Sequence, residues 1–156
     1  MSTAILIRRS NPADASIVAE FNALLAQETE QLALDRVGLR AGVEAVLGDA
    51  SRGIYWLAMA DGEVVGQLMI TFEWSDWRNG FFWWIQSVYV RQDWRGRGVF
   101  RALYEHVHRE AKSRGDVCGL RLYVEHENQP ARKTYERMGL RATSYDFYEV
   151  DFRIAR

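Results

Sequence analysis

The segment that most constrains the fold is an apolar run that leads into a glycine-rich loop and an amphipathic helix. Residues 81–90 read FFWWIQSVYV, which is long and apolar enough for a strand at the centre of a sheet. Gly96 and Gly98 follow, and the next residues carry apolar side chains at helical spacing. The run at residues 117–124 then alternates as a strand does. We therefore predict a β-α-β unit with the glycine loop at the start of its helix, over about residues 98–114.

The other elements follow from hydrophobic spacing and turn residues. Asp61-Gly62 is a favoured two-residue turn between two apolar runs, so residues 53–74 are expected to form a hairpin. Helices are expected at residues 11–31, 40–49 and 128–138, and further strands at residues 4–9, 117–124 and, as one or two strands, 140–152. This order, βααβββαβαβ, predicts an α/β (α+β mixed) fold whose mostly antiparallel, twisted central sheet carries helices on both faces. The length of 156 residues favours one domain, residues 1–156.

Composition narrows the choice of partner and location. The formal net charge is −1, which argues against nucleic acid as the main partner. No segment approaches the ~20 apolar residues of a membrane span, and the apolar run at residues 4–7 is too short for a secretory signal. Cys118 is the only cysteine, and no His/Cys/Asp cluster has metal-ligand spacing. We expect a cytoplasmic protein with no metal, no membrane contact and no nucleic-acid partner.

The glycine loop has the chemistry of an anion site. The first amides of a helix have no partner within the helix, and the helix dipole adds about half a positive charge there. Arg95, Arg97 and Arg101 surround the same point, so the loop suits a pyrophosphate. Arg101 stands where the dinucleotide fingerprint has its third glycine, and no Walker sequence occurs. On its own, the two-glycine loop is also compatible with a tight strand-to-helix turn.

A second motif follows the strand predicted at residues 117–124. Asn128, Ala131, Tyr135 and Gly139 follow one another at spacings of 3, 4 and 4, which puts the first three on one face of a helix. Together, the two motifs resemble the two signatures of the GCN5-related N-acetyltransferase (GNAT) family, which uses acetyl-CoA. The first signature reads RGRGVF here, at residues 95–100, and the second, Asn-x-x-Ala-x-x-x-Tyr followed by Gly, is matched in full. The strand order also fits that family.

The resemblance implies a role for each matching position. The backbone of Val88 and Val90 would hold the pantetheine arm, Asn128 would contact the cofactor from the other side, and Tyr135 would donate a proton to the departing CoA thiolate. The pyrophosphate would lie on the loop formed by Arg95, Gly96, Arg97, Gly98, Val99, Phe100 and Arg101. The family has a small residue in place of Phe100, whose register with the apolar stripe of its helix predicts that the ring turns into the core.

Several residues are candidates to accept the proton of the amine. The segment around the central strand is similar to diamine acetyltransferases, which carry a glutamate on that strand, but this chain has Gln86 there. Glu73 on the neighbouring strand is the catalytic candidate that we carry forward, as a general base or a contact to the amine. Glu125 and His126, which follow the strand at residues 117–124, are alternatives.

Several aromatic and acidic side chains are candidates to contact the amine that accepts the acetyl group. Trp74 and Trp84 either pack on one another across a hairpin, or line a pocket for a cationic amine, or stack nucleic-acid bases, and the net charge disfavours the last. Glu28, Glu30 and Asp76 are candidates for acidic contacts to a cationic substrate.

These features predict an acetyl-CoA-dependent N-acetyltransferase that transfers acetyl to a primary amine of a small molecule or peptide, by direct attack in a ternary complex. The alternative is a non-catalytic regulatory module that binds CoA or acyl-CoA. The aromatic tail, YDFYEVDF at residues 145–152, is compatible with a homodimer formed through terminal strands or with a place inside the sheet.

Overall fold

The computed structural model of the chain describes residues 3–154. The chain divides into two compact units, Met1–Leu122 and Tyr123–Arg156. In the part that the structure describes, the first unit contains the sheet with α1 to α3, and the second contains α4 (Gln129–Arg137) and the C-terminal segment. The organisation of residues 1–156 as one domain stays a prediction.

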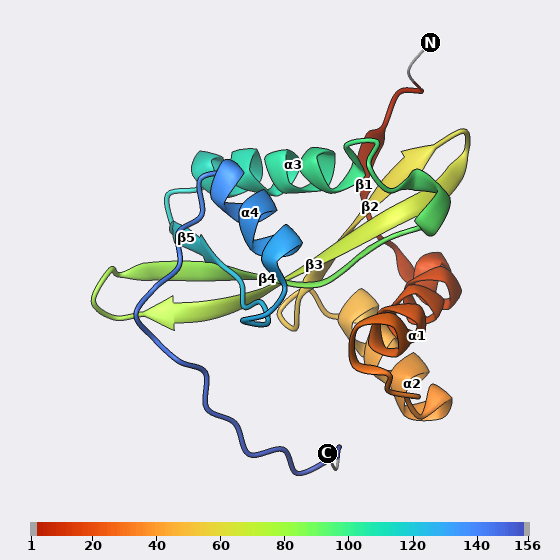
Figure 1. Cartoon of the computed structure of the whole chain (residues 1–156), viewed down its shortest axis with the longest axis horizontal. Coiled ribbons are helices and arrows are strands. Elements are labelled where there is room, and N and C mark those ends of the chain that lie inside the picture. Colours follow the sequence, from red (N-terminus) through yellow and green to blue (C-terminus); the bar gives the residue numbers. More distant parts are fainter. Residues whose placement is uncertain (1–2, 155–156) are drawn as a thin grey trace. The chain divides into compact units, whose positions relative to one another are not determined.

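The first unit is built on a five-stranded mixed sheet (Figure 1). In the order β1-β2-β3-β4-β5, the strands are β1 (Leu6–Arg9), β2 (Ile54–Ala60), β3 (Glu63–Ser75), β4 (Gly80–Val90) and β5 (Val117–Arg121). The pairs from β1 to β4 are antiparallel, and β5 runs parallel to β4. This parallel pair is the predicted β-α-β unit, because α3 (Val99–Ser113) connects its strands. The expected fold class is therefore confirmed.

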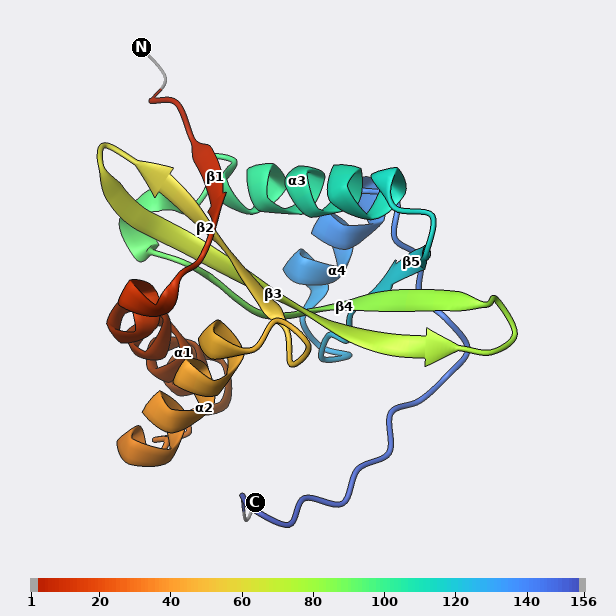
Figure 2. The same ribbon diagram turned by 180° about the vertical axis from the view of Figure 1, so that it is seen from behind.

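Helices cover both faces of this sheet, with α3 on one face and α1 (Ala15–Glu30) and α2 (Arg36–Gly48) on the other (Figures 1 and 2). Neighbouring residues of β3 point to opposite faces, as the pleat requires. Gly66 lies against Val99 of α3, where an added Cβ would come within 2.8 Å of that side chain. Gln67 reaches α1 instead, where it donates a hydrogen bond to Asn22.

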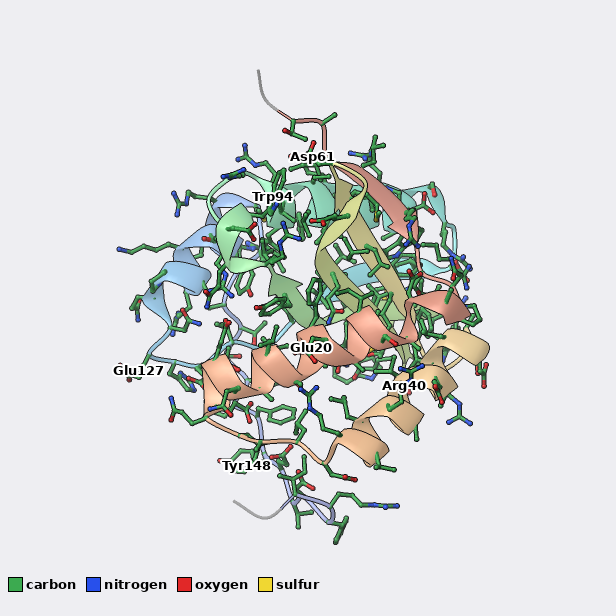
Figure 3. The ribbon with its side chains drawn as sticks, turned by 90° about the vertical axis from the view of Figure 1, so that its right-hand side faces the viewer. Glu20, Arg40, Asp61, Trp94, Glu127 and Tyr148 are labelled. Carbon is green, nitrogen blue, oxygen red and sulfur yellow. The ribbon has the colours of Figure 1, made fainter. Side chains whose placement is uncertain are left out.

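The two helices of the second face, α1 and α2, lie side by side, as Figure 3 shows by the labels Glu20 on α1 and Arg40 on α2. Arg36 of α2 pairs with Glu20 at 3.1 Å. Helix α2 begins four residues before the predicted start at residue 40, because the Asp35 carboxylate accepts hydrogen bonds from the amides of Val37 and Gly38. The spacing of apolar residues does not predict this cap.

The core of the first unit lies on both sides of the sheet. The fully buried apolar side chains include Leu57, Leu68, Ile70, Leu103 and Val107. They belong to β2 and β3, which lie inside the sheet, and to the side of α3 that faces the sheet. Within the described residues, no helix combines the length and the apolar character needed to cross a membrane.

Among its described residues, the second unit contains one helix, and its C-terminal segment differs from the prediction. Asn128 caps α4, and Gly139 follows the helix with a positive φ of 96°, as expected of a helix end. The predicted strands at residues 140–152 are wrong, because the described part of that segment is irregular. Apolar alternation favours a strand, but a strand also needs a neighbouring backbone for its ladder. Here the turns are closed by the Thr143 and Asp151 side chains instead. Likewise, β5 ends at Arg121 rather than at residue 124.

Candidate active site

The first feature of the site is the second half of β4, which on its β5 side pairs with no strand among residues 3–154. Strands β4 and β5 pair from Phe81 to Trp84, where Trp84 lies opposite Arg121, but β4 continues to Val90. The amide of Arg91 donates to the Val65 carbonyl on β3, at 2.9 Å. Because backbone groups alternate in direction along a strand, those of Val90 and Val88 point away from β3, toward the side where β5 has ended. An extended ligand chain can pair there as a strand would.

A bulge in β4 sets this direction. Gln67 of β3 lies opposite Tyr89, but Met69 lies opposite Gln86, so β4 contains one more residue than β3 over this stretch. Ser87 within the bulge has a φ of 50°, in the left-handed region. The extra residue reverses the alternation of all following residues of β4, which include Val88 and Val90.

The glycine loop lies between β4 and α3, after the short 3-10 turn Gln92–Trp94. Trp94 is buried and anchors this turn (labelled in Figure 3). Gly96 and Gly98 have φ values of 73° and 81°, and a Cβ added to either would meet no atom within 4 Å. Glycine is therefore required for conformation rather than for space. The first bond of the helix runs from the Ala102 amide to the Gly98 carbonyl, so the three preceding amides point out of the helix end.

The three arginines of the loop have different partners. Arg95 is turned back toward α1: it donates to the Glu28 carboxylate at 2.6 Å and to the Val90 carbonyl at 2.9 Å. Glu28 also accepts from the Tyr89 hydroxyl, and the hydrogen bond from Arg95 holds the Glu28 pKa below its usual value. Arg97 lies over the Trp94 ring, with 4.8 Å from the guanidinium carbon to the ring centroid.

Arg101 lies on the exposed side of the first turn of α3, 3.9 Å from Glu105. Arg95 therefore links the loop to α1, although its side chain is about half exposed, whereas the contacts of Arg97 and Arg101 are with the loop and with α3. Phe100 is only half-buried and lies 6.2 Å from the Tyr104 ring, centroid to centroid. Its ring thus lies at the margin of the core and not within it, whereas Val99 is buried.

Glu73 belongs to a polar cluster on the α1/α2 face of the sheet. Its carboxylate accepts hydrogen bonds from the Trp84 indole at 2.9 Å and from the Arg121 guanidinium at 2.8 Å. These contacts, the Trp84 bond first, hold the Glu73 pKa below its usual value. Nearby on the same face, Gln86 donates to the Thr71 hydroxyl. The arrangement keeps Glu73 ionised and makes its carboxylate a weaker proton acceptor than a free one.

Trp74 and Trp84 lie on opposite faces of the sheet. Trp74 is paired with Phe81 across the β3–β4 hairpin, edge to face, with 4.9 Å between ring centroids. Trp84 lies opposite Thr71 instead. The register therefore excludes packing of Trp74 on Trp84. Residue spacing in the sequence does not predict this register. Trp74 is about half exposed, and Trp84 belongs to the Glu73 cluster.

The second signature lies in the second unit. The Asn128 side chain accepts a hydrogen bond from the Ala131 amide at 3.2 Å, so within this unit its role is to cap α4. Tyr135 lies on α4, two turns after the cap. Glu125 and His126 precede the helix, and the His126 carbonyl accepts from the Gln129 and Arg132 side chains.

Comparison with known proteins identifies the family. A sequence model of the Acetyltransferase (GNAT) family matches residues 20–140, which is most of the chain. The chain belongs to this family. The crystal structure of a possible acetyltransferase from Clostridium difficile 630 is 42% identical, with a TM-score of 0.89, over 94% of this chain and 97% of the other. This GNAT protein is accordingly an enzyme of the N-acetyltransferase type. No curated protein matches its sequence.

Two more distant structures share the fold of this GNAT protein. A ribosomal-protein-alanine N-acetyltransferase from Brucella melitensis biovar Abortus 2308 is 23% identical, with a TM-score of 0.77, over 96% of this chain and 99% of the other. A predicted acetyltransferase with acetyl-CoA from Clostridium acetobutylicum is 19% identical, with a TM-score of 0.74, over 95% and 96%. At these identities the likeness concerns the fold alone.

Sequence reasoning missed the buried polar residues of this GNAT protein. Gln67, Asn22 and Tyr55 are all buried, and Asn22 accepts a hydrogen bond from Gln67 and donates one to Tyr55. A signal was present, because Gln67 interrupts an apolar strand segment, VVGQLMI, at residues 64–70. The partnership of Glu28 with Arg95 had no such signal, since 67 positions separate the two residues. Among residues 3–154, no group of three or more His, Cys, Asp or Glu side chains is arranged to hold a metal.

Proposed function

We propose that the protein transfers acetyl from acetyl-CoA to a primary amine of a small molecule or peptide, by direct attack in a ternary complex. One observation carries the proposal: the bulged, unpaired edge of β4 leads directly into the glycine loop and the uncapped N-terminus of α3. A strand edge suits the amide-containing pantetheine arm, and a helix end suits a pyrophosphate. Acetyl-CoA contains both groups, joined in that order.

Each half of the cofactor has candidate ligands in this chain. The backbone groups of Val88 and the Val90 amide are the proposed partners of the pantetheine amides, while the Val90 carbonyl is already engaged by Arg95. The amides at the start of α3, with Arg97 and Arg101, are the proposed partners of the pyrophosphate. Asn128 and Tyr135, from the second signature, complete the proposed set.

The proposed reaction forms one bond and breaks one. The ammonium first gives one proton to water, and the neutral amine nitrogen then attacks the thioester carbonyl carbon. The C–S bond breaks, the CoA thiolate takes the hydroxyl proton of Tyr135, and the second proton of the amine nitrogen returns through water to the Tyr135 oxygen. An alkyl ammonium has a pKa near ~10.4, so its deprotonation at pH 7 costs roughly 4–5 kcal/mol. Glu73 is the proposed contact for this ammonium. Its lowered pKa favours attraction of the cation over uptake of its proton.

A thermal-shift titration tests the cofactor. A ligand that binds only the folded state stabilises it by about 2.7 kcal/mol at one hundred times its dissociation constant. Acetyl-CoA should therefore raise the melting temperature by several degrees, and desulfo-CoA should do so too, because the proposed contacts do not need the sulfur. An unchanged melting temperature at millimolar acetyl-CoA would contradict the proposed cofactor.

Release of CoA thiol over a panel of amines tests the reaction. Tyr135→Phe should lower kcat at least about tenfold while the acetyl-CoA dissociation constant changes less, because a hydroxyl proton is needed only when the thiolate leaves. Glu73→Gln should raise KM for a cationic amine more than it lowers kcat. If acetyl-CoA binds and no amine releases thiol, a non-catalytic CoA-binding module becomes the better description.

A further inference from the structure

We propose that Gln67 is a positioning residue for the cofactor: its buried amide holds the Ser87 carbonyl, and thereby the β4 bulge that turns the backbone of Val88 to the open edge. This inference rests on the proposed function, because it assigns Gln67 a role in binding acetyl-CoA. No contact between Gln67 and the cofactor is implied.

A chain of buried hydrogen bonds connects α1 and β2 to the bulge. The Gln67 amide nitrogen donates to the Ser87 carbonyl at 3.1 Å and to the Asn22 side-chain oxygen at 3.0 Å. The Asn22 amide in turn donates to the Tyr55 hydroxyl at 2.9 Å. All three side chains are buried, and Gln67 has no exposed surface. The bulge is thus attached to elements that lie well outside the β4 strand itself.

Tyr55 forms the far end of this chain of hydrogen bonds. Burial raises the pKa of the Tyr55 hydroxyl, and the hydrogen bond with Asn22 opposes that rise. Ser87, which has a left-handed backbone within β4, is held at its carbonyl by Gln67. Asn22 and Tyr55 hold Gln67 in place through the rest of the chain.

The choice of glutamine is poorly explained by stability alone. The Gln67 side-chain oxygen is buried and has no hydrogen-bond partner. An unpartnered buried acceptor costs folding free energy, and an apolar side chain of similar size would avoid that cost. What an apolar side chain lacks is a donor for the Ser87 carbonyl. The position therefore serves the geometry of the bulge at the expense of stability.

Loss of the bulge would reverse the backbone of the proposed cofactor site. A serine at φ 50° is strained relative to the extended conformation, so the bulge requires contacts that hold it. Because strand alternation has a period of two, removal of the extra residue would turn the groups of Val88 and Val90 toward β3. The pantetheine arm would then lose its proposed partners although no residue that contacts it has changed.

The test compares acetyl-CoA dissociation constants, measured by calorimetry, for the wild type and Gln67→Leu. We expect the constant to rise roughly tenfold, the scale of one lost buried hydrogen bond. Adding Ser87→Gly to Gln67→Leu should recover most of the affinity, because glycine adopts a positive φ without strain. This recovery is the readout that a merely structural role of Gln67 would not produce. Val107→Ala, a core substitution in α3, is the control for lost stability and should leave the constant unchanged.

Tyr55→Phe keeps the ring in the core and removes only the hydroxyl, so it remains informative if Gln67→Leu does not fold. Its dissociation constant should rise at least about twofold. The inference is overturned if folded Gln67→Leu binds as the wild type does, if Ser87→Gly recovers nothing, or if Val107→Ala weakens binding equally. Should Gln67→Leu not fold, unchanged binding by Tyr55→Phe overturns it. A wild type that does not bind acetyl-CoA contradicts the proposed cofactor itself, which is a separate failure.

Discussion

At the scale of single residues, Arg95 and Arg97 belong to the same loop motif but differ in their contacts. The Arg95 guanidinium is held by Glu28 of α1 and by the Val90 carbonyl, and it also lies over the Tyr89 ring. Arg97 has a single described contact of this kind, with the Trp94 ring, and remains at the surface. Arg95 is thus a link between the loop and α1, and Arg97 is the arginine that we propose as a phosphate contact.

This difference is testable with two matched substitutions. Arg97→Gln should raise the acetyl-CoA dissociation constant about fivefold, which corresponds to ~1 kcal/mol for an exposed charge contact, and the effect should shrink at high salt. Arg95→Gln should lower the melting temperature more and change the salt dependence of binding less. A larger salt-sensitive loss of affinity for Arg95→Gln than for Arg97→Gln would contradict this assignment. Calorimetry at low and high ionic strength supplies both numbers.

At the scale of elements, the entrance of α3 depends on a conformation that only glycine adopts at little cost. Gly98→Ala should destabilise the fold by about 1–2 kcal/mol, although the added methyl group meets no neighbour, because its φ of 81° is left-handed. Thermal unfolding measures the change. Gly42→Ala is the matched control: that glycine lies within α2, also with free space around it, and alanine there should stabilise by about 0.5–1 kcal/mol. Equal effects of the two substitutions would contradict this explanation.

The packing of α3 on β2 should also respond to pH. The His106 ring lies 4.4 Å from the Trp56 ring, centroid to centroid, and burial lowers the His106 pKa below its usual value. The folded protein therefore prefers the neutral imidazole. This contribution to stability is complete above the unfolded pKa, near ~6.5, and is lost as the pH falls through the folded pKa.

Unfolding free energies measured from pH 8 down to pH 5 should therefore fall less steeply for His106→Gln than for the wild type. His108→Gln, on the exposed side of the same helix, is the control and should keep the wild-type slope. A wild-type slope for His106→Gln as well would show that His106 does not carry the effect.

At the scale of the whole molecule, the two units differ in the hydrogen-bond partners of their backbone amides. The amides of β2, β3 and β4 are hydrogen-bonded within the ladders of the sheet. From residue 141 onward, the described backbone hydrogen bonds are those closed by Thr143 and Asp151 side chains. The aromatic side chains of the tail, Tyr145, Phe147, Tyr148 and Phe152, are mostly exposed.

Amide hydrogen exchange should report this difference. Amides of central β3 are expected to exchange only through global unfolding, whereas those of residues 141–150 should exchange within seconds to minutes, as unprotected amides do. Dilution of the protein provides the control, because protection that depended on a second copy would decrease with concentration. Slow, concentration-independent exchange in residues 141–150 would contradict the irregular backbone seen here.

The β-α-β unit, the glycine loop and the helix cap at Asn128 could be predicted from the sequence, because each depends on neighbours within a few residues. Hydrophobic spacing, the left-handed preference of glycine and side-chain capping all act over that range. The mixed sheet followed for the same reason, since short connections leave few ways to pair successive strands.

Contacts between side chains that are distant in the sequence could not be predicted in this way. The pairing of Arg95 with Glu28, the opposite faces of Trp74 and Trp84, and the hold of Gln67 on Ser87 depend on strand register and on how helices pack. The same applies to residues 140–152, whose alternation lacked the neighbouring backbone that a strand requires. Local preference acts within a segment, whereas a single extra residue in β4 reverses every side chain and amide beyond it, and that effect is visible only once the strands are paired.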